Sequence, residues 1–98
     1  MFLIINNMTV INVNYITRYD IEEHYLNQRN TVYGITFDIL RNDSLFLLLD
    51  WINDIQDEIQ QKEELNKFLN FLYGSLKTEG SLFTNVFINT QNGNYYTR

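Results

Sequence analysis

The fold is decided in residues 31–59, whose sequence is TVYGITFDIL RNDSLFLLLD WINDIQDEI. In the first ten residues, Tyr33, Ile35 and Phe37 alternate with small or polar side chains, and this period of two predicts a half-buried strand over 31–40. In the remainder, apolar residues recur every three or four positions, which predicts an amphipathic helix. Its apolar stripe would consist of Leu45, Leu48, Ile52, Ile55 and Ile59. The residues Asn42, Asp43 and Ser44 are three candidate N-caps for this helix.

A second helix is predicted directly after the first. The stripe lapses at 60–62 and resumes out of phase with Leu65, Phe68, Leu69 and Leu72, and Gly74 is a candidate C′ residue. A single helix over 43–73 would be roughly 45 Å long at 1.5 Å per residue, which exceeds the span of a compact domain of this size. We therefore expect two helices in the middle of the chain.

Both ends of the chain favour strands. At the N-terminus, strands are predicted over 2–5 and 10–15, with Asn6-Asn7 as a turn between them because asparagine tolerates positive φ. At the C-terminus, residues 82–90 are rich in β-formers, and Asn92-Gly93 predicts a two-residue hairpin turn. Such a turn would place Thr90 opposite Tyr95 and Ile88 opposite Thr97.

Residues 17–28 fit two interpretations. Thr17 followed by Asp20 resembles a capping box, which favours a short helix. The alternation of Tyr19, Ile21, Glu23 and Tyr25 instead favours a strand that ends in a hairpin loop at 27–30. Of the two, we favour the helix.

These elements predict a single α+β domain over residues 1–98. An antiparallel sheet, made of the N-terminal strands and the C-terminal β-hairpin, would pack against the two central helices. Ten residues are expected in the core: Ile11, Val13, Ile35, Phe37, Leu48, Ile52, Ile55, Leu69, Leu72 and Phe87.

Charge and composition exclude several classes of function. The formal net charge is −5, and the seven Lys and Arg residues are scattered, so we expect no direct binding to nucleic acid or to an anionic membrane. With no Cys and one His, a structural zinc site is not expected. Asp50, Asp54 and Asp57 have helical spacing and could share a hard cation, but a solvated helix face is the favoured interpretation, so no metal or cofactor is expected. The N-terminus lacks a signal-peptide pattern and no apolar run is long enough to span a bilayer, which favours a cytoplasmic location.

No established catalytic motif is present, so we expect that the protein is not an enzyme. Its only histidine forms the pattern Arg18-x₅-His24. This spacing is similar to one found in small helical ribonucleases of the HEPN type. The resemblance implies that Arg18 would stabilise a phosphate and that His24 would act as acid or base. A small ribonuclease-like enzyme is therefore one alternative function.

Acidic residues form the most informative surface feature of the sequence. On the predicted helix, Asp50, Asp54 and Asp57 lie opposite the apolar stripe, and Glu58 lies at the edge of that acidic face. Like charges four residues apart oppose helix stability by roughly 0.2–0.5 kcal/mol per pair, so an excess of one sign indicates that something basic meets it. We predict that these four residues bind a partner protein.

The expected function is therefore that of a small acidic protein-binding module. Its partner would be a protein with a basic or aromatic surface, such as a nucleic-acid-binding protein. The size, the charge and the lack of a catalytic motif are similar to those of phage or mobile-element inhibitors of bacterial defence, such as anti-CRISPR proteins, and of immunity proteins and antitoxins. The surplus of Tyr and Trp also favours protein contacts. A homo-oligomeric structural subunit is a further alternative.

Overall fold

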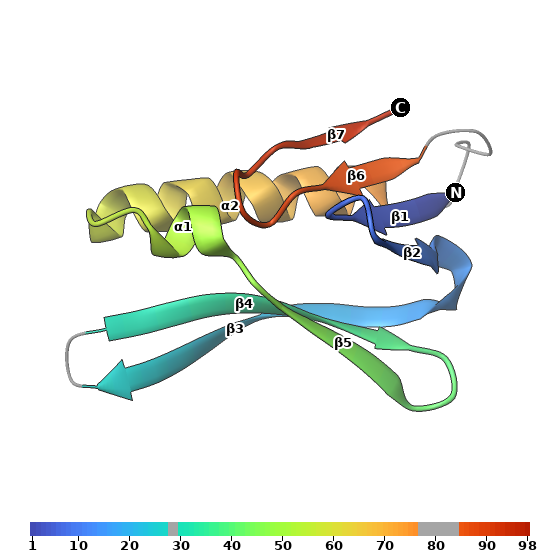
Figure 1. Cartoon of the computed structure of the whole chain (residues 1–98), viewed down its shortest axis with the longest axis horizontal. Helices are drawn as coiled ribbons and strands as arrows, with labels where there is room; N and C mark the ends of the chain where they lie inside the picture. The colour runs from blue at the N-terminus through green and yellow to red at the C-terminus, as the bar shows by residue number, and fades with distance from the viewer. Residues whose placement is uncertain (28–29, 77–84) are drawn as a thin grey trace.

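The computed structural model describes residues 1–27, 30–76 and 85–98. Two β-sheets and one long helix surround a single hydrophobic core (Figure 1). The predicted mixture of α and β structure is confirmed. Two of its details are corrected, because the strands form two sheets instead of one, and the helical part is one long helix preceded by a single helical turn.

The first sheet, which we call sheet A, has the strand order β2-β1-β6-β7. Its strands are β1 (Phe2–Ile5), β2 (Thr9–Asn12), β6 (Val86–Ile88) and β7 (Tyr95–Thr97). The predicted turn at Asn6-Asn7 is confirmed, with φ values of 54° and 57°. The sheet is not wholly antiparallel, because β1 and β6 are parallel. Parallel neighbours require a long crossover, and here the chain passes through the second sheet and the helix before it returns beside β1.

The second sheet, sheet B, is an antiparallel meander in the order β3-β4-β5. Its strands are β3 (Ile16–Asn27), β4 (Asn30–Ile39) and β5 (Asp43–Leu48). The helix favoured for residues 17–28 is wrong, since this segment forms β3, with Tyr19 opposite Phe37 and Ile21 opposite Ile35. Pairing of alternate apolar side chains across the strands outweighs the capping pattern. The centre of the loop suggested at 27–30 lies outside the described residues.

The first predicted helix is replaced at its start by β5. Positive φ values at Arg41 (73°) and Asn42 (65°) turn the chain back along β4, so that Leu45 lies opposite Phe37 and Leu47 opposite Ile35. Leu48, predicted to be buried, is 47% exposed. The run LFLLL over 45–49 fits a helix or a strand equally well, because consecutive apolar residues carry no period.

The helical part begins later than predicted. α1 (Asp50–Asn53) is a single turn, and α2 (Glu58–Ser75) is the only long helix in the described part of the chain. Asp57 caps α2 by accepting a hydrogen bond from the backbone N–H of Ile59 (3.0 Å). α2 continues through Gly74, which is therefore not the predicted C′ residue. A 3₁₀ turn, Val13–Tyr15, ends the predicted strand over 10–15 early and leaves Tyr15 exposed.

The core lies between the two sheets and α2. Six of the predicted core residues are buried in it: Ile11, Val13, Ile35, Phe37, Ile52 and Leu72. Ile55, Leu69 and Phe87 are half-buried. Sheet A contributes Leu3, Ile5, Val86 and Ile88, and α2 contributes Phe68. The predicted stripe fails again at Ile59, which is 69% exposed.

One side chain completes the hydrogen bonding of β4. The ladder between β4 and β5 ends where Gly34 pairs with Leu48. Beyond it, the Leu49 N–H donates to the Tyr33 carbonyl (3.1 Å), but the Tyr33 N–H has no partner on β5. The Asn53 carboxamide completes the hydrogen bonding of the Tyr33 backbone on this side. The Tyr33 N–H donates to Asn53 Oδ1 (2.8 Å), and Asn53 Nδ2 donates to the Tyr33 carbonyl (3.0 Å). Since Tyr33 is buried, these backbone groups depend on protein partners.

This arrangement predicts the effect of replacing Asn53. Asn53→Ala leaves the Tyr33 N–H without its partner and should cost about 1–3 kcal/mol in urea unfolding at pH 7.5. Asn53→Asp should be at least as costly at that pH, because a carboxylate cannot donate to the Tyr33 carbonyl.

The two variants should differ in how their loss of stability depends on pH. Repulsion from the Tyr33 carbonyl should raise the pKa of the new carboxyl in the folded state, so the deficit of Asn53→Asp relative to the parent should shrink as pH falls through that pKa. The deficit of Asn53→Ala should not change with pH. Equal pH dependence of the two deficits would contradict this role of Asn53.

Candidate functional site

The four acidic residues predicted to bind a partner lie at the corner between α1 and α2. Asp50 begins α1, Asp54 follows it, Asp57 caps α2, and Glu58 is the first residue of α2. They do not share one continuous helix face as predicted, because Asp57 has extended backbone (φ −81°, ψ 117°). Asp54, Asp57 and Glu58 are exposed, and Asp50 is half-buried. The corner therefore keeps the acidic residues together although the helix is interrupted.

A carboxylate from sheet B lies at the same end of the molecule. Burial raises the pKa of the Tyr33 hydroxyl above its ordinary value; Glu23 raises that pKa further, Lys62 lowers it, and Glu58 raises it. Glu23 in β3 and Glu58 in α2 thus both act on one hydroxyl group. Figure 1 shows that the end of β3, the start of β4 and the α1–α2 corner lie at the same end of the molecule. We call Glu23, Asp54, Asp57 and Glu58 the acidic end.

The structure separates Arg18 from His24. Both residues lie on β3 and point away from the core, because their neighbours Tyr19 and Ile21 face it. Six residues of strand span roughly 20 Å at about 3.3 Å per residue, which is too far for both side chains to contact one phosphate. Each is also paired with a nearby carboxylate, Arg18 with Asp20 and His24 with Glu22 (3.2 Å). This geometry does not support a ribonuclease site that uses these two residues.

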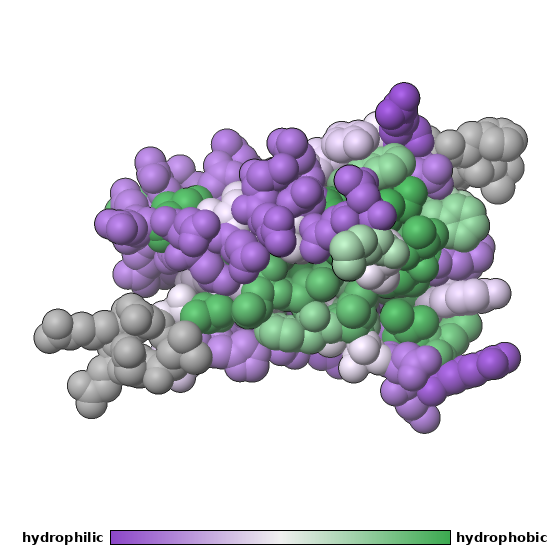
Figure 2. Space-filling model, viewed as in Figure 1, coloured by the Kyte–Doolittle hydropathy of each residue, from purple (hydrophilic) through white to green (hydrophobic). Residues whose placement is uncertain are grey.

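A second surface feature lies on the outer side of sheet A. One apolar residue from each strand forms a row across the sheet: Val10, Ile4, Phe87 and Tyr96. Val10 is 62% exposed and Tyr96 is 47% exposed, and the rings of Phe87 and Tyr96 stack with centroids 5.0 Å apart. We call this row the neutral face. Figure 2 shows hydrophobic surface in this region and hydrophilic surface over α1 and the start of α2.

None of the four residues of the neutral face is charged, and the charged residue at its edge is Arg98, which pairs with Asn85. Residues 1–15 and 85–97, which form all of sheet A and its turns, contain no Asp, Glu, Lys, Arg or His. All but one of the charged side chains therefore fall in residues 16–84, and Arg98 is the exception. Our interpretation of the sequence considered only where acidic residues gather. It missed the lack of charged residues in 1–15 and 85–97, which is visible in the sequence.

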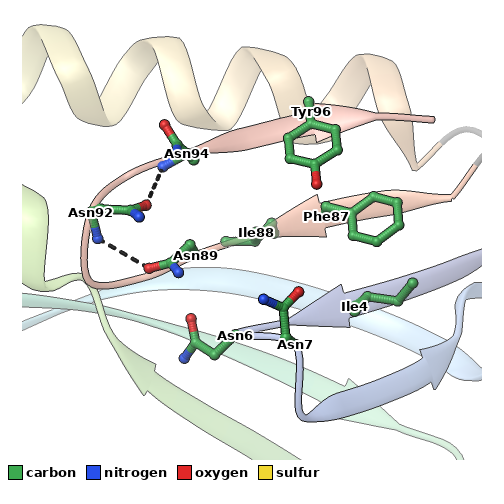
Figure 3. Close-up of a pocket in the computed structure, with 9 residues that line it drawn as sticks. All are labelled: Ile4, Asn6, Asn7, Phe87, Ile88, Asn89, Asn92, Asn94 and Tyr96. Atoms are coloured by element: carbon green, nitrogen blue, oxygen red, sulfur yellow. Dashed lines mark hydrogen bonds between the residues drawn. The ribbon is translucent and has the colours of Figure 1, made fainter.

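A hollow of about 190 Å³ lies beside the neutral face (Figure 3). Asparagines from two turns surround it: Asn6, Asn7, Asn89, Asn92 and Asn94. Some of their oxygens hold the turn, since Asn89 Oδ1 accepts from the Asn92 N–H (3.0 Å) and Asn92 Oδ1 accepts from the Asn94 N–H (2.9 Å). The hollow is therefore polar but uncharged.

The turn between β6 and β7 is wider than predicted. Ile88 pairs with Tyr95, not with Thr97, and of Asn92 and Gly93 only Gly93 has positive φ (77°). The Gly93 N–H donates to the Asn89 carbonyl (3.0 Å), which closes a longer loop than a two-residue turn. Residues 82–84 of the predicted strand lie outside the described residues.

Two contacts fix this turn to the rest of the molecule. The Thr90 N–H donates to Asn6 Oδ1 (2.8 Å), and Asn6 Nδ2 donates to Thr90 Oγ1 (3.0 Å). The indole of Trp51 lies against Gly93, where a Cβ atom would come within 2.5 Å of Trp51 Cδ1. The hollow is thus built on a turn held from both sides.

The described residues were also compared with the patterns of metal sites and membrane-spanning helices. Within 1–27, 30–76 and 85–98, no three His, Asp or Glu side chains are grouped so that they could hold a metal ion. In the same part of the chain no helix is long and apolar enough to cross a bilayer.

Comparison with protein-family models, with curated proteins and with solved structures finds no match to this chain.

The packing at Gly93 predicts a contrast between two glycines. Gly93→Ala should lower the free energy of unfolding by about 1–3 kcal/mol, because a non-glycine residue at positive φ is strained and its Cβ must displace Trp51. Gly74→Ala should raise it by about 0.5–1 kcal/mol, because Gly74 is helical and no atom lies within 4 Å of the added Cβ. Urea unfolding of both variants checks this, and equal effects at the two positions would be inconsistent with the described turn.

Proposed function

We propose that this chain is a small acidic protein-binding module that acts by occupying a surface of another protein. The class of protein that we expect is an inhibitor, either of the phage or mobile-element type that blocks bacterial defence, such as anti-CRISPR proteins, or of the immunity-protein or antitoxin type. The proposed contact is the acidic end, together with the half-buried Asp50.

The observation that carries this proposal is the gathering of carboxylates from separate elements at one end of the molecule. Glu23 comes from β3, Asp54 and Asp57 from the α1–α2 corner, and Glu58 from α2. Lys62, 3.6 Å from Glu58, is the one Lys or Arg side chain within salt-bridge distance of these four in the described residues. An exposed group of like charges produces a local potential that attracts and orients an oppositely charged surface.

The chemistry of the acidic end defines the partner. Carboxylates complement Lys and Arg, so the fitting surface is a basic groove of the kind that otherwise holds nucleic acid. The chain's own net charge of −5 gives it no attraction for the nucleic acid itself. It would therefore compete with the nucleic acid for the same protein.

Replacing the acidic end tests this proposal. The variant Asp54→Asn/Asp57→Asn/Glu58→Gln changes the net charge from −5 to −2, and Asn can still cap α2 at position 57. A matched control, Asp20→Asn/Asp38→Asn/Asp43→Asn, makes the same change in charge on sheet B, at residues outside the acidic end. Each variant is used as bait in a bacterial lysate, and the retained proteins are quantified by mass spectrometry.

We expect the parent and the control to retain the same partner and the acidic-end variant to lose it. The purified partner should then bind the parent more slowly and less tightly as salt rises, because a Debye length of about 8 Å at 0.15 M screens exposed charges. Equal retention by all three baits, or retention by none, would refute the acidic end as the contact.

A further inference from the structure

We infer that a second copy of this chain docks on the neutral face of sheet A, so that two molecules form a twofold-symmetric dimer. This inference does not rest on the proposed function. It concerns a different surface, and it makes a different prediction about salt.

Within residues 1–27, 30–76 and 85–98, no helix or strand packs on the neutral face of the four-stranded sheet A. The inner side of sheet A is filled by Leu3, Ile5, Val86 and Ile88. The outer side has the row Val10, Ile4, Phe87 and Tyr96, and Phe2 is also exposed. Arg98, two positions after Tyr96 and joined to Asn85 by two backbone hydrogen bonds, is a charged neighbour at the edge of this row. Apolar and aromatic side chains with few charged groups among them are the composition found at the centre of protein–protein interfaces.

Electrostatics favours an identical chain as the occupant. Each copy has a formal net charge of −5, so two copies repel each other wherever their charged surfaces meet. Sheet A is built from two segments, 1–15 and 85–97, that contain no Asp, Glu, Lys, Arg or His, and Arg98 is the charged residue at its edge. Two like-charged copies therefore approach at least cost through this face.

The polar groups around the neutral face are complementary to themselves. In a twofold-symmetric contact each surface meets its own copy, so a patch of one charge is excluded. A carboxamide carries both a donor and an acceptor and can therefore pair with an identical group. The asparagines around the hollow provide such groups beside the apolar row (Figure 3).

The outer face of sheet B does not share these properties. Phe46 is 44% exposed there, and its ring lies over Gly34. However, β3, on the other side of β4, carries the pairs Arg18–Asp20 and Glu22–His24 on the same face. Desolvating these pairs would oppose a close contact, so the neutral face is the better surface for a second copy.

The size of the face predicts a weak dimer. Four strands about 4.8 Å apart, each three or four residues long, make a face roughly 15–20 Å by 10–13 Å, or about 150–260 Å², which is less than the interface of about 800 Å² per partner found in standard complexes. We therefore expect a dissociation constant in the micromolar range or weaker, and association that becomes stronger or stays constant as salt rises.

Sedimentation equilibrium between about 5 and 500 μM, a range that brackets weak protein contacts, tests the inference. The parent mass should rise from 11.8 kDa towards twice that value. Val10→Glu and Tyr96→Glu should each raise the dissociation constant at least about tenfold, because each places a charge at the contact. Ile59→Glu is the matched control, since it adds the same charge at an exposed apolar position on α2 and should associate like the parent.

Three results would overturn the inference. The first is a parent that remains at 11.8 kDa over the whole range. The second is equal association of the parent, Val10→Glu and Tyr96→Glu, with circular dichroism showing that both variants are folded. The third is association that weakens with rising salt, which would indicate a contact between charged surfaces. The first two leave the proposed role of the acidic end unaffected.

Discussion

The structure depends on asparagine side chains that complete the hydrogen bonding of its backbone. Its strands in sheet A are three or four residues long, and such short strands leave polar groups at their ends without ladder partners. Asn53 supplies a donor and an acceptor to Tyr33, and Asn6 does the same for Thr90 near the opposite end of the chain. Asn85 accepts from the backbone N–H of Phe2. These contacts join segments far apart in sequence, which hydrophobic burial alone would not hold in one register, since it is not directional.

Sequence patterns predicted the elements whose apolar residues have a clear period. Tyr33, Ile35 and Phe37 alternate with small or polar residues, and β4 lies where they predict it; the Asn6-Asn7 turn is confirmed for an equally local reason. The prediction failed at 45–49, where every residue is apolar, and at 17–28, where a local capping pattern competed with pairing to a distant strand. Partition into two sheets and the parallel contact of β1 with β6 depend on contacts between residues more than eighty positions apart, which no local pattern encodes.

The candidate surfaces differ in how far the sequence predicted them. Asp50, Asp54, Asp57 and Glu58 are close in sequence, so their proximity survives although the predicted helix does not. The contribution of Glu23 required the folded chain, because β3 and α2 come together only through the core. The neutral face combines the two cases: the lack of charge in 1–15 and 85–97 is visible in the sequence, but only the pairing of β1 with β6 makes these segments one surface.

The separation of the two surfaces has a consequence for binding. In Figure 1, strands β1, β2 and β6 lie towards the end of the molecule that holds the N-terminus, and the start of α2 lies at the other end of the longest dimension of 43 Å, although the β6–β7 turn reaches α1 and packs against Trp51. Two copies joined through the neutral face would leave both acidic ends exposed and directed away from the contact. A partner that presents two basic surfaces would then be bound twice, and the second binding event would gain from the effective concentration set by the first. Weak contacts at each acidic end would suffice for tight occupation of such a partner, whereas a monomer would need the full affinity in a single contact.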